Sequence, residues 1–241
     1  MNDKTAMEEI SILKKLSVPT LSPMSERLLV MLQLQRMIND RMDEQWHSHH
    51  PPFLRAAIMG AADAVNHYGY KWWEKKSPDL PQARLALVDV FHFLISYEML
   101  GNGRRDNELV KIANELENMY AVNLNIHLYQ GLSFTQKMDA FIARASEGEA
   151  AMWPAFFSAM ADIDMDWECL NRMCFSKNVL NLFRQDYGQN DGTYTHVWNG
   201  KEDAVHLQEI IDSMHSLDAT TIRHALVARY ATAITGRRST D

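Results

Sequence analysis

Residues 66–81 read Asn-His-Tyr-Gly-Tyr-Lys-Trp-Trp-Glu-Lys-Lys-Ser-Pro-Asp-Leu-Pro, and residues 82–96 continue Gln-Ala-Arg-Leu-Ala-Leu-Val-Asp-Val-Phe-His-Phe-Leu-Ile-Ser. The first segment is aromatic and ends in two prolines, which predicts a compact turn. The second segment carries apolar residues at helical spacing. We therefore expect an aromatic turn that joins two helices, over residues 53–75 and 82–100.

Two acidic residues lie on otherwise apolar faces of these helices. Asp63 lies on or beside the apolar stripe of the first helix, and Asp89 interrupts the stripe of the second. A carboxylate among apolar neighbours costs free energy unless a cation or hydrogen-bond donors compensate it. Because carboxylate oxygens are ligands that Mg²⁺ prefers, the pair predicts a metal site. His92 either assists this site or is a core histidine with an internal hydrogen bond.

The composition favours an all-α protein. The chain has 241 residues, of which 46% are hydrophobic, and glycine and proline are scarce. That length is sufficient for one well-packed domain. We expect a single domain over residues 1–241, in which 1–20 form an N-terminal extension and 204–241 a C-terminal helical extension.

Charge and hydropathy limit the partners and the compartment. The formal net charge of −7 argues against nucleic-acid polymers as the main partner. No stretch is long and apolar enough to span a bilayer, and the N-terminus lacks the apolar region of a signal peptide. Cys169 and Cys174 are interpreted as reduced, buried thiols. We expect a cytoplasmic protein without a membrane partner.

Further helices are predicted over residues 26–46, 107–128 and 133–147, and as a long amphipathic run over 149–175. Gln35 and Asn39 are four residues apart, so they share one face of the first of these helices. Such a pair is either a solvated stripe or a polar recognition site. Residues 47–52 contain three histidines without partner ligands at fixed spacing, which is typical of a solvated loop.

A second polar motif begins at Lys177. Its members recur at three- and four-residue spacing and make one cationic helix face, formed by Lys177, Asn178, Asn181 and Arg184. Such a face suits phosphate and sugar, although a solvated helix has a similar pattern. The glycine-rich segment 188–200 that follows can fold over a ligand as a lid.

With these motifs the chain resembles the all-α dimeric dUTPases, relatives of the MazG-like nucleoside triphosphate pyrophosphohydrolases, from about residue 28 to residue 207. The resemblance is carried by Leu34-Gln-Arg-Met-Ile-Asn39, His67-Tyr-Gly-Tyr-Lys-Trp-Trp73, Leu87-Val-Asp-Val-Phe-His-Phe93, Lys177-Asn-Val-Leu-Asn-Leu-Phe-Arg-Gln-Asp186, Gly192-Thr-Tyr194 and Trp198-Asn-Gly-Lys-Glu-Asp203. It implies a helical bundle, a homodimer and a deoxyuridine-type nucleotide as ligand.

The resemblance also implies roles for single residues. Gln35 and Asn39 would read the pyrimidine, and Trp72 and Trp73 would form an aromatic wall. Tyr194 would close the lid. The sugar and phosphate contacts would come from Lys177, Asn178, Asn181 and Arg184. His196 stands where a lysine is common in the family, which removes one expected phosphate contact.

The chain departs from the family at the metal site. The family holds Mg²⁺ with a Glu-x-x-Glu pair before the aromatic turn and a Glu-x-x-Asp pair after it, and three-residue spacing aims both acids of a pair into the bundle. Here the pairs read Gly60-Ala-Ala-Asp63 and Ala86-Leu-Val-Asp89. Asp63 and Asp89 remain as candidate ligands of Mg²⁺ in a weakened site. Glu74 and Glu98 are candidate replacements for the missing acids.

Three functions are therefore compatible with the sequence. The first is hydrolysis of dUTP or another dNTP to the monophosphate and pyrophosphate with a reduced metal set. The second is a repurposed enzyme that acts on a deoxypyrimidine mononucleotide without the metal cluster, with Asp63 or Asp89 as acid or base. The third is a catalytically inactive homologue that senses a nucleotide or binds another protein.

Overall fold

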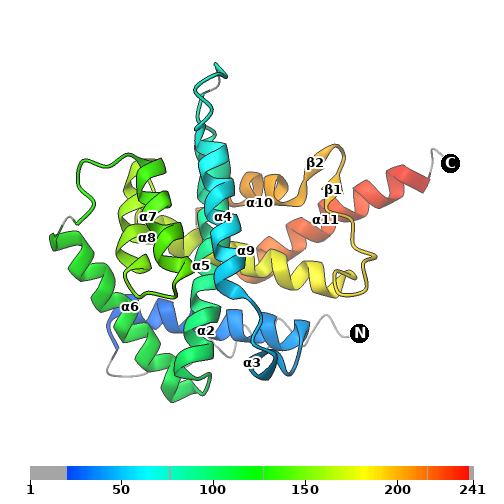
Figure 1. Cartoon of the computed structure of the whole chain (residues 1–241). Coiled ribbons are helices and arrows are strands. Elements are labelled where there is room, and N and C mark those ends of the chain that lie inside the picture. Colours follow the sequence, from blue (N-terminus) through cyan, green and yellow to red (C-terminus); the bar gives the residue numbers. More distant parts are fainter. Residues whose placement is uncertain (1–20, 76, 127, 216, 239–241) are drawn as a thin grey trace.

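The computed structural model describes residues 21–75, 77–126, 128–215 and 217–238 (Figure 1). The expected N-terminal extension, residues 1–20, lies outside the described residues. The all-α prediction is confirmed, since helices make up almost all of the regular structure. Among the described helices, none has the length and apolar character needed to cross a membrane.

Most of the helices follow one another with short connections. Their bounds are α2 Pro23–Met42, α3 Trp46–His49, α4 Phe53–Tyr68, α5 Leu80–Asn102, α6 Asp106–Ile126, α7 Phe134–Ser146, α8 Met152–Met160, η1 Ala161–Ile163, α9 Trp167–Asp186, α10 Asp203–Asp212 and α11 Ala219–Arg238. The longer connections join α4 to α5 and α9 to α10. Between α9 and α10, β1 (Val197–Trp198) pairs with β2 (Lys201–Glu202) in an antiparallel register.

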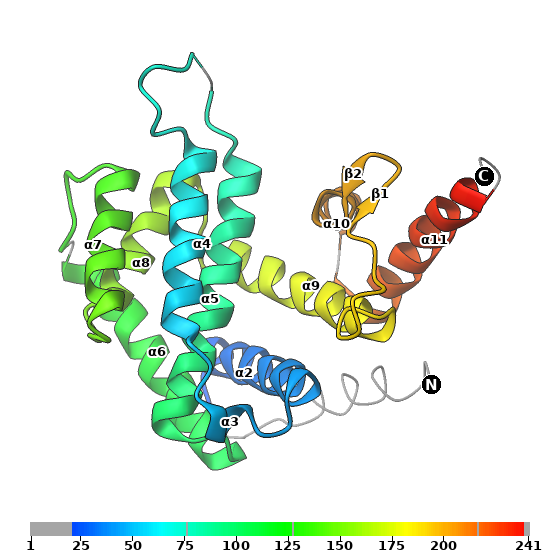
Figure 2. The same cartoon turned by 45° about the vertical axis from the view of Figure 1, so that its right-hand side comes forward.

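Helices α4 and α5 form an antiparallel hairpin with close packing (Figure 2). Small residues on α4 allow this approach, because Ala57, Ala61 and Ala64 are completely buried. The prediction that α4 continues to residue 75 is wrong. The helix ends at Gly69, whose φ of 95° lies in the left-handed region that glycine adopts without strain. The aromatic segment that follows projects away from the rest of the protein.

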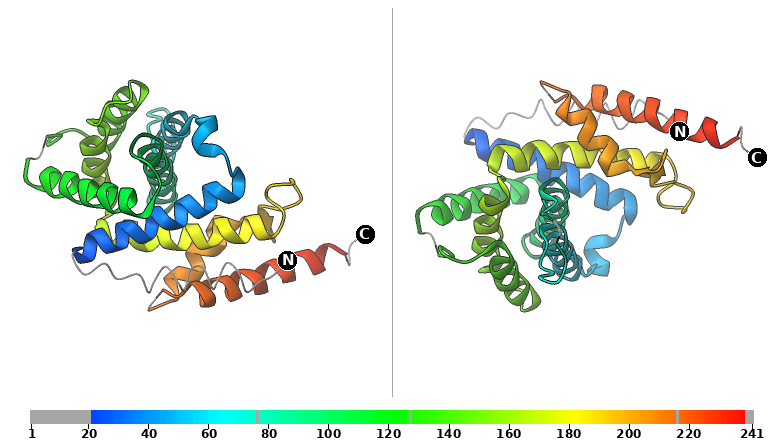
Figure 3. Two further views of the ribbon diagram at one scale, coloured as in Figure 1. Left: turned by 90° about the horizontal axis from the view of Figure 1, so that it is seen from below. Right: turned by 90° about the horizontal axis from the view of Figure 1, so that it is seen from above.

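The buried apolar residues form two clusters. The larger one unites one face of α2 with α4 to α8 and the first half of α9. The smaller one unites the other part of α2 with the second half of α9, the loop that follows it, α10 and α11. Helices α2 and α9 lie side by side and contribute to both clusters (Figure 3). Polar residues on these two helices therefore lie at the junction of the clusters.

Two other sequence predictions need correction. The amphipathic run over residues 149–175 is not continuous, because the chain turns at Asp164, which has a φ of 52°, before Asp166 caps α9. Aspartate tolerates the left-handed conformation and its carboxylate accepts from a backbone N–H at a helix start, here that of Cys169. The histidine segment is not entirely a loop, since α3 occupies part of it.

Candidate functional site

A polar site lies where α2, α5 and α9 cross. Gln35 and Asn39 come from α2, Asp89 from α5, and Lys177 and Asn178 from α9. Four of these five side chains are buried, and Asp89 is partly exposed. Helix packing alone explains why these residues meet, since each of the three helices contacts the other two. The junction of the two apolar clusters thus contains a group of polar side chains.

The polar residues of α2 form a hydrogen-bonded chain with α5. Gln35 Nε2 donates to Asn39 Oδ1 at 2.9 Å, and Asn39 Nδ2 donates to Ser96 Oγ at 3.1 Å. The Ser96 hydroxyl donates in turn to the backbone carbonyl of His92 at 2.8 Å. These hydrogen bonds fix the amides of Gln35 and Asn39, yet Gln35 Oε1 has no hydrogen-bond partner among the described residues. One acceptor of the predicted base-reading pair therefore remains open.

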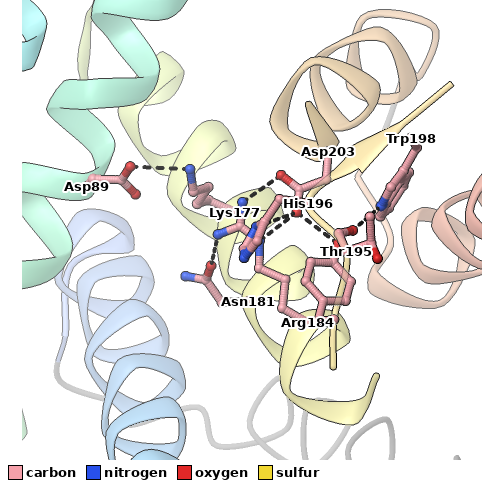
Figure 4. Close-up of polar contacts among 9 residues, drawn as sticks. Asp89, Lys177, Asn181, Arg184, Thr195, His196, Trp198 and Asp203 are labelled. Atoms are coloured by element: carbon pink, nitrogen blue, oxygen red, sulfur yellow. Dashed lines mark hydrogen bonds and ion pairs between the residues drawn. The ribbon is translucent and has the colours of Figure 1, made fainter. Parts of the chain in front are cut away.

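Lys177 forms an ion pair with Asp89. The ammonium nitrogen lies 3.3 Å from Asp89 Oδ2, and the lysine side chain is buried (Figure 4). The Asp89 side chain is 41% exposed, so solvent and ligands can reach the pair from that side. Lys177 is predicted to contact phosphate and Asp89 to bind a metal, and the structure places the two side chains next to each other. That arrangement brings together two motifs that are 88 residues apart in the chain.

Two further polar groups of the site are buried with few or no partners. His92 is 4% exposed, and its ring nitrogens make no hydrogen bond of good geometry to a described residue, although the ring interacts with the backbone of Cys174 on α9. Burial lowers the pKa of the His92 imidazole to about 4, against the opposing effect of Asp89, so the ring is neutral at pH 7. The Asn178 amide is completely buried and both of its polar atoms are also unpaired. Buried polar atoms in folded proteins are mostly paired, which makes this concentration unusual.

Arg184 belongs to a separate cluster about two helical turns beyond Lys177 on α9. Its Nε and Nη2 donate to the two carboxylate oxygens of Asp203, at 2.8 and 2.7 Å, and Nη1 donates to Asn181 Oδ1 at 3.2 Å. Although burial acts in the opposite direction, the hydrogen bonds from Arg184 hold the pKa of Asp203 below its usual value. The guanidinium therefore joins α9 to the start of α10, and a ligand would meet it already paired.

Tyr194 attaches the glycine-rich loop to this cluster. Its hydroxyl donates to Asp203 Oδ2 at 2.8 Å, and its ring packs among Phe183, Trp198 and Tyr230. Burial, together with the Asp203 carboxylate, raises the pKa of Tyr194. Asp203 has no role that its spacing in the sequence predicts, because an acid at a helix start is common. It accepts hydrogen bonds from both Arg184 and Tyr194.

The remaining acids do not fit the metal cluster of the family. Asp63 is largely exposed and lies 3.6 Å from His67 of its own helix, while Asp89 is paired with Lys177. A Cβ atom on Gly60 would lie 3.0 Å from Val90 Cγ2, so any side chain there requires Val90 to move. The described residues contain no group of three or more His, Cys, Asp or Glu that could hold a metal. Mg²⁺ at Asp63 and Asp89 stays a prediction.

The two candidate replacement acids have other contacts. Glu98 accepts a hydrogen bond from Trp153 Nε1 at 2.7 Å, and burial raises the pKa of its carboxyl group. Glu74 lies in the aromatic segment and pairs with Lys71 at 3.4 Å. Each carboxylate therefore has a partner within the protein that does not involve a metal.

The predicted aromatic wall is not part of the helix crossing in a single chain. Trp72 is 90% exposed and Trp73 is 59% exposed, and their rings contact each other in an edge-to-face arrangement. Both lie in the projecting segment between α4 and α5. A cavity of about 820 Å³ lies elsewhere, between the start of α4, the end of α5 and α7, and none of the predicted binding residues lines it.

Fold and site together define an all-α protein in which a polar, partly cationic site is enclosed by three crossing helices. The family model described as dUTPase matches residues 27–189, which include the whole crossing. The chain therefore belongs to this family, the all-α dimeric dUTPases. No curated protein matches the chain.

Proposed function

We propose that this protein binds a deoxypyrimidine nucleotide of the deoxyuridine type at the crossing of α2, α5 and α9. The observation that carries the proposal is the group of unpaired, buried polar atoms at the crossing, from Gln35 and Asn178. Each buried group without a partner costs about 1–3 kcal/mol. A ligand with matching donors and acceptors would remove that cost.

The chemistry of a uracil nucleotide matches these groups. A uracil ring presents one N–H donor between two carbonyl acceptors, and Gln35 offers an open acceptor beside the amide of Asn39. Lys177 supplies a cation for phosphate, and Asn178 supplies a neutral amide for the sugar. Membership of the dUTPase family supports the same ligand class.

In this proposal Arg184, Asn181 and Tyr194 act together. Their hydrogen bonds, centred on Asp203, hold the glycine-rich loop against α9. The loop is thereby held against α9, where Asn181 lies four residues from Lys177 and so shares its helix face. Hydrolysis of dUTP with Mg²⁺ at Asp63 and Asp89 is a second candidate, favoured by the family match alone.

We also propose that the protein is a homodimer, as family membership suggests. The exposure of Tyr70, Trp72 and Trp73 supports this, because a contiguous exposed aromatic group is typical of an interaction surface. Sedimentation equilibrium of the wild type and of a Trp72→Ser variant would measure it: dimerisation weakened by the substitution is expected, and a monomeric wild type would contradict the proposal.

Isothermal titration calorimetry with dUMP tests the proposed ligand. The wild type is expected to bind, and Gln35→Leu is expected to weaken binding at least tenfold, about 1.4 kcal/mol, through loss of the polar contact to the base. Gln33→Leu is the matched control, because Gln33 is also buried on α2 but two residues away, on another face. An equal loss of dUMP affinity in both variants would reject Gln35 as the residue that contacts the base.

A pyrophosphate-release assay on dUTP with Mg²⁺, run in parallel, separates the two candidate functions. Release of pyrophosphate that Asp89→Ala abolishes would establish the second candidate. Binding of dUMP without any release would leave nucleotide binding as the function of the site.

A further inference from the structure

We infer that this site selects a nucleoside monophosphate over a triphosphate and binds it without a divalent cation, because Lys177, held by Asp89, supplies the positive charge that meets the phosphate. The inference rests on the proposed nucleotide-binding function and specifies its ligand class. It is carried by the ion pair, by the charges around it and by the packing at Gly60.

The charges at the site balance without a ligand. Lys177 is paired with Asp89, and Arg184 with Asp203. Arg184 binds both carboxylate oxygens of the buried Asp203, whereas the Lys177 ammonium makes a single 3.3 Å contact with a partly exposed carboxylate and has two further hydrogens. One ammonium group with hydrogens to spare matches one phosphate group.

A triphosphate needs more positive charge than this site offers. Each further phosphoryl group adds negative charge, which bound metal ions neutralise in the enzymes that act on triphosphates. His92 is a further basic side chain beside the pair, but burial keeps it neutral at pH 7, and Arg184 is already paired with Asp203. The β- and γ-phosphates would therefore face Asp89 without a compensating cation.

Lys177 and a metal ion would compete for the same carboxylate. If Asp89 bound a metal, the buried ammonium would lose its partner and face a second cation, and an unpaired buried charge is strongly destabilising. A Cβ atom at position 60 would lie 3.0 Å from Val90 Cγ2 and 3.7 Å from the carbonyl oxygen of Ala86, so an additional acid there would require Val90 to shift. The ion pair thus takes the position that a metal would need.

Calorimetric titrations test the inference with three ligands: deoxyuridine, dUMP and a non-hydrolysable dUTP analogue, each with Mg²⁺ or with EDTA. The wild type should bind dUMP at least tenfold more tightly than the dUTP analogue, with less than a twofold effect of Mg²⁺. Lys177→Met should weaken dUMP at least tenfold and leave deoxyuridine within twofold. Asp89→Asn should retain or strengthen dUMP binding, because it releases the ammonium for the phosphate.

A matched ion pair elsewhere provides the control. Lys137 is also buried and lies 2.7 Å from Asp162, between α7 and η1. Asp162→Asn makes the same chemical change as Asp89→Asn and should leave all three affinities unchanged. Circular dichroism of each variant verifies the helical fold.

The outcomes separate this inference from the proposed function. Tighter binding of the dUTP analogue with Mg²⁺, abolished by Asp89→Asn, would overturn the inference and leave nucleotide binding intact. Failure of all three ligands to bind the wild type would overturn both. An unchanged affinity of Lys177→Met for dUMP would overturn the role of Lys177 alone.

Discussion

The helix hairpin α4–α5 and the segment from α9 to α10 both correspond to polar motifs of the family. The hairpin has lost two of its acids, whereas the α9–α10 segment retains a connected set of polar side chains. In the hairpin, positions 60 and 86 carry glycine and alanine, and the helices pack directly against each other. In the α9–α10 segment, Arg184, Tyr194 and Asp203 form a satisfied network.

The difference lies in what each motif does for stability. Carboxylates that face one another repel when no cation is bound, so they contribute nothing to the fold by themselves. A bidentate Arg–carboxylate pair with a tyrosine donor connects two helices and a loop whether or not a ligand is present. Polar residues are thus retained where they pair within the folded protein, as Arg184 does with Asp203, whereas the acids that the family has at positions 60 and 86 are missing.

The largest expected effect comes from breaking the α9–α10 network. Arg184→Met should lower the free energy of unfolding by about 3–5 kcal/mol, because it leaves the buried Asp203 carboxylate without its cation. Urea denaturation measures the change. Arg27→Met is the control: Arg27 also pairs with a carboxylate on another helix, Glu168, but both groups are exposed, so the loss should be about 0.5 kcal/mol. A similar loss of unfolding free energy in both variants would contradict the difference expected between a buried and an exposed ion pair.

A second test concerns His92, which faces α9 from the hairpin. Its folded-state pKa of about 4 lies below the unfolded value of 6.5, so as the pH falls the unfolded chain takes up the proton first. Stability should be fully present above pH 6.5 and fall by about 3 kcal/mol down to pH 4.

Urea titrations at pH 7 and pH 4.5 measure that slope. His92→Leu should flatten it, and the control His224→Asn should not, since His224 is exposed. A His92→Leu variant with the wild-type pH dependence would show that another group is responsible.

The smallest effect is expected where the hairpin packs most closely. In a helix Gly→Ala normally stabilises by about 1 kcal/mol, but at Gly60 the new methyl group would press on Val90, and overpacking costs about 1–3 kcal/mol. We expect Gly60→Ala to lower the free energy of unfolding by about 1 kcal/mol. Gly101→Ala, on α5 with open space around it, should raise it by about 0.5 kcal/mol. A stabilising Gly60→Ala would show that the helices can separate.

The fold was largely predictable because most helices carry strong local signals. Helix α5 combines an apolar stripe with a proline in its first turn and the capping residue Asp79, so its prediction from residue 82 to 100 nearly equals the observed Leu80–Asn102. The errors lie where one residue in the left-handed conformation ends or breaks a helix, at Gly69 and Asp164. An apolar pattern continues through such residues and does not reveal the break.

The sequence predicts which residues belong to the candidate site, but it does not predict which of them pair with one another. Spacing places Gln35 beside Asn39 and collects the polar residues of α9 on one face, since both relations are local. The Lys177–Asp89 pair joins residues 88 positions apart, and Asp203 meets Arg184 through a loop whose course the sequence does not specify. Whether His92 and Asn178 are paired depends on the packing of three helices, which no local pattern records.

The contact between Gly60 and Val90 also limits how this chain could evolve. A side chain at position 60 requires Val90 to shift by a few tenths of an ångström, and a smaller residue at 90 would leave a void while position 60 is glycine. A return to the four-acid pattern requires acids at both positions 60 and 86, and the first of them also requires Val90 to give way. Directed evolution of this chain toward triphosphate hydrolysis would therefore have to start from combined rather than stepwise substitutions.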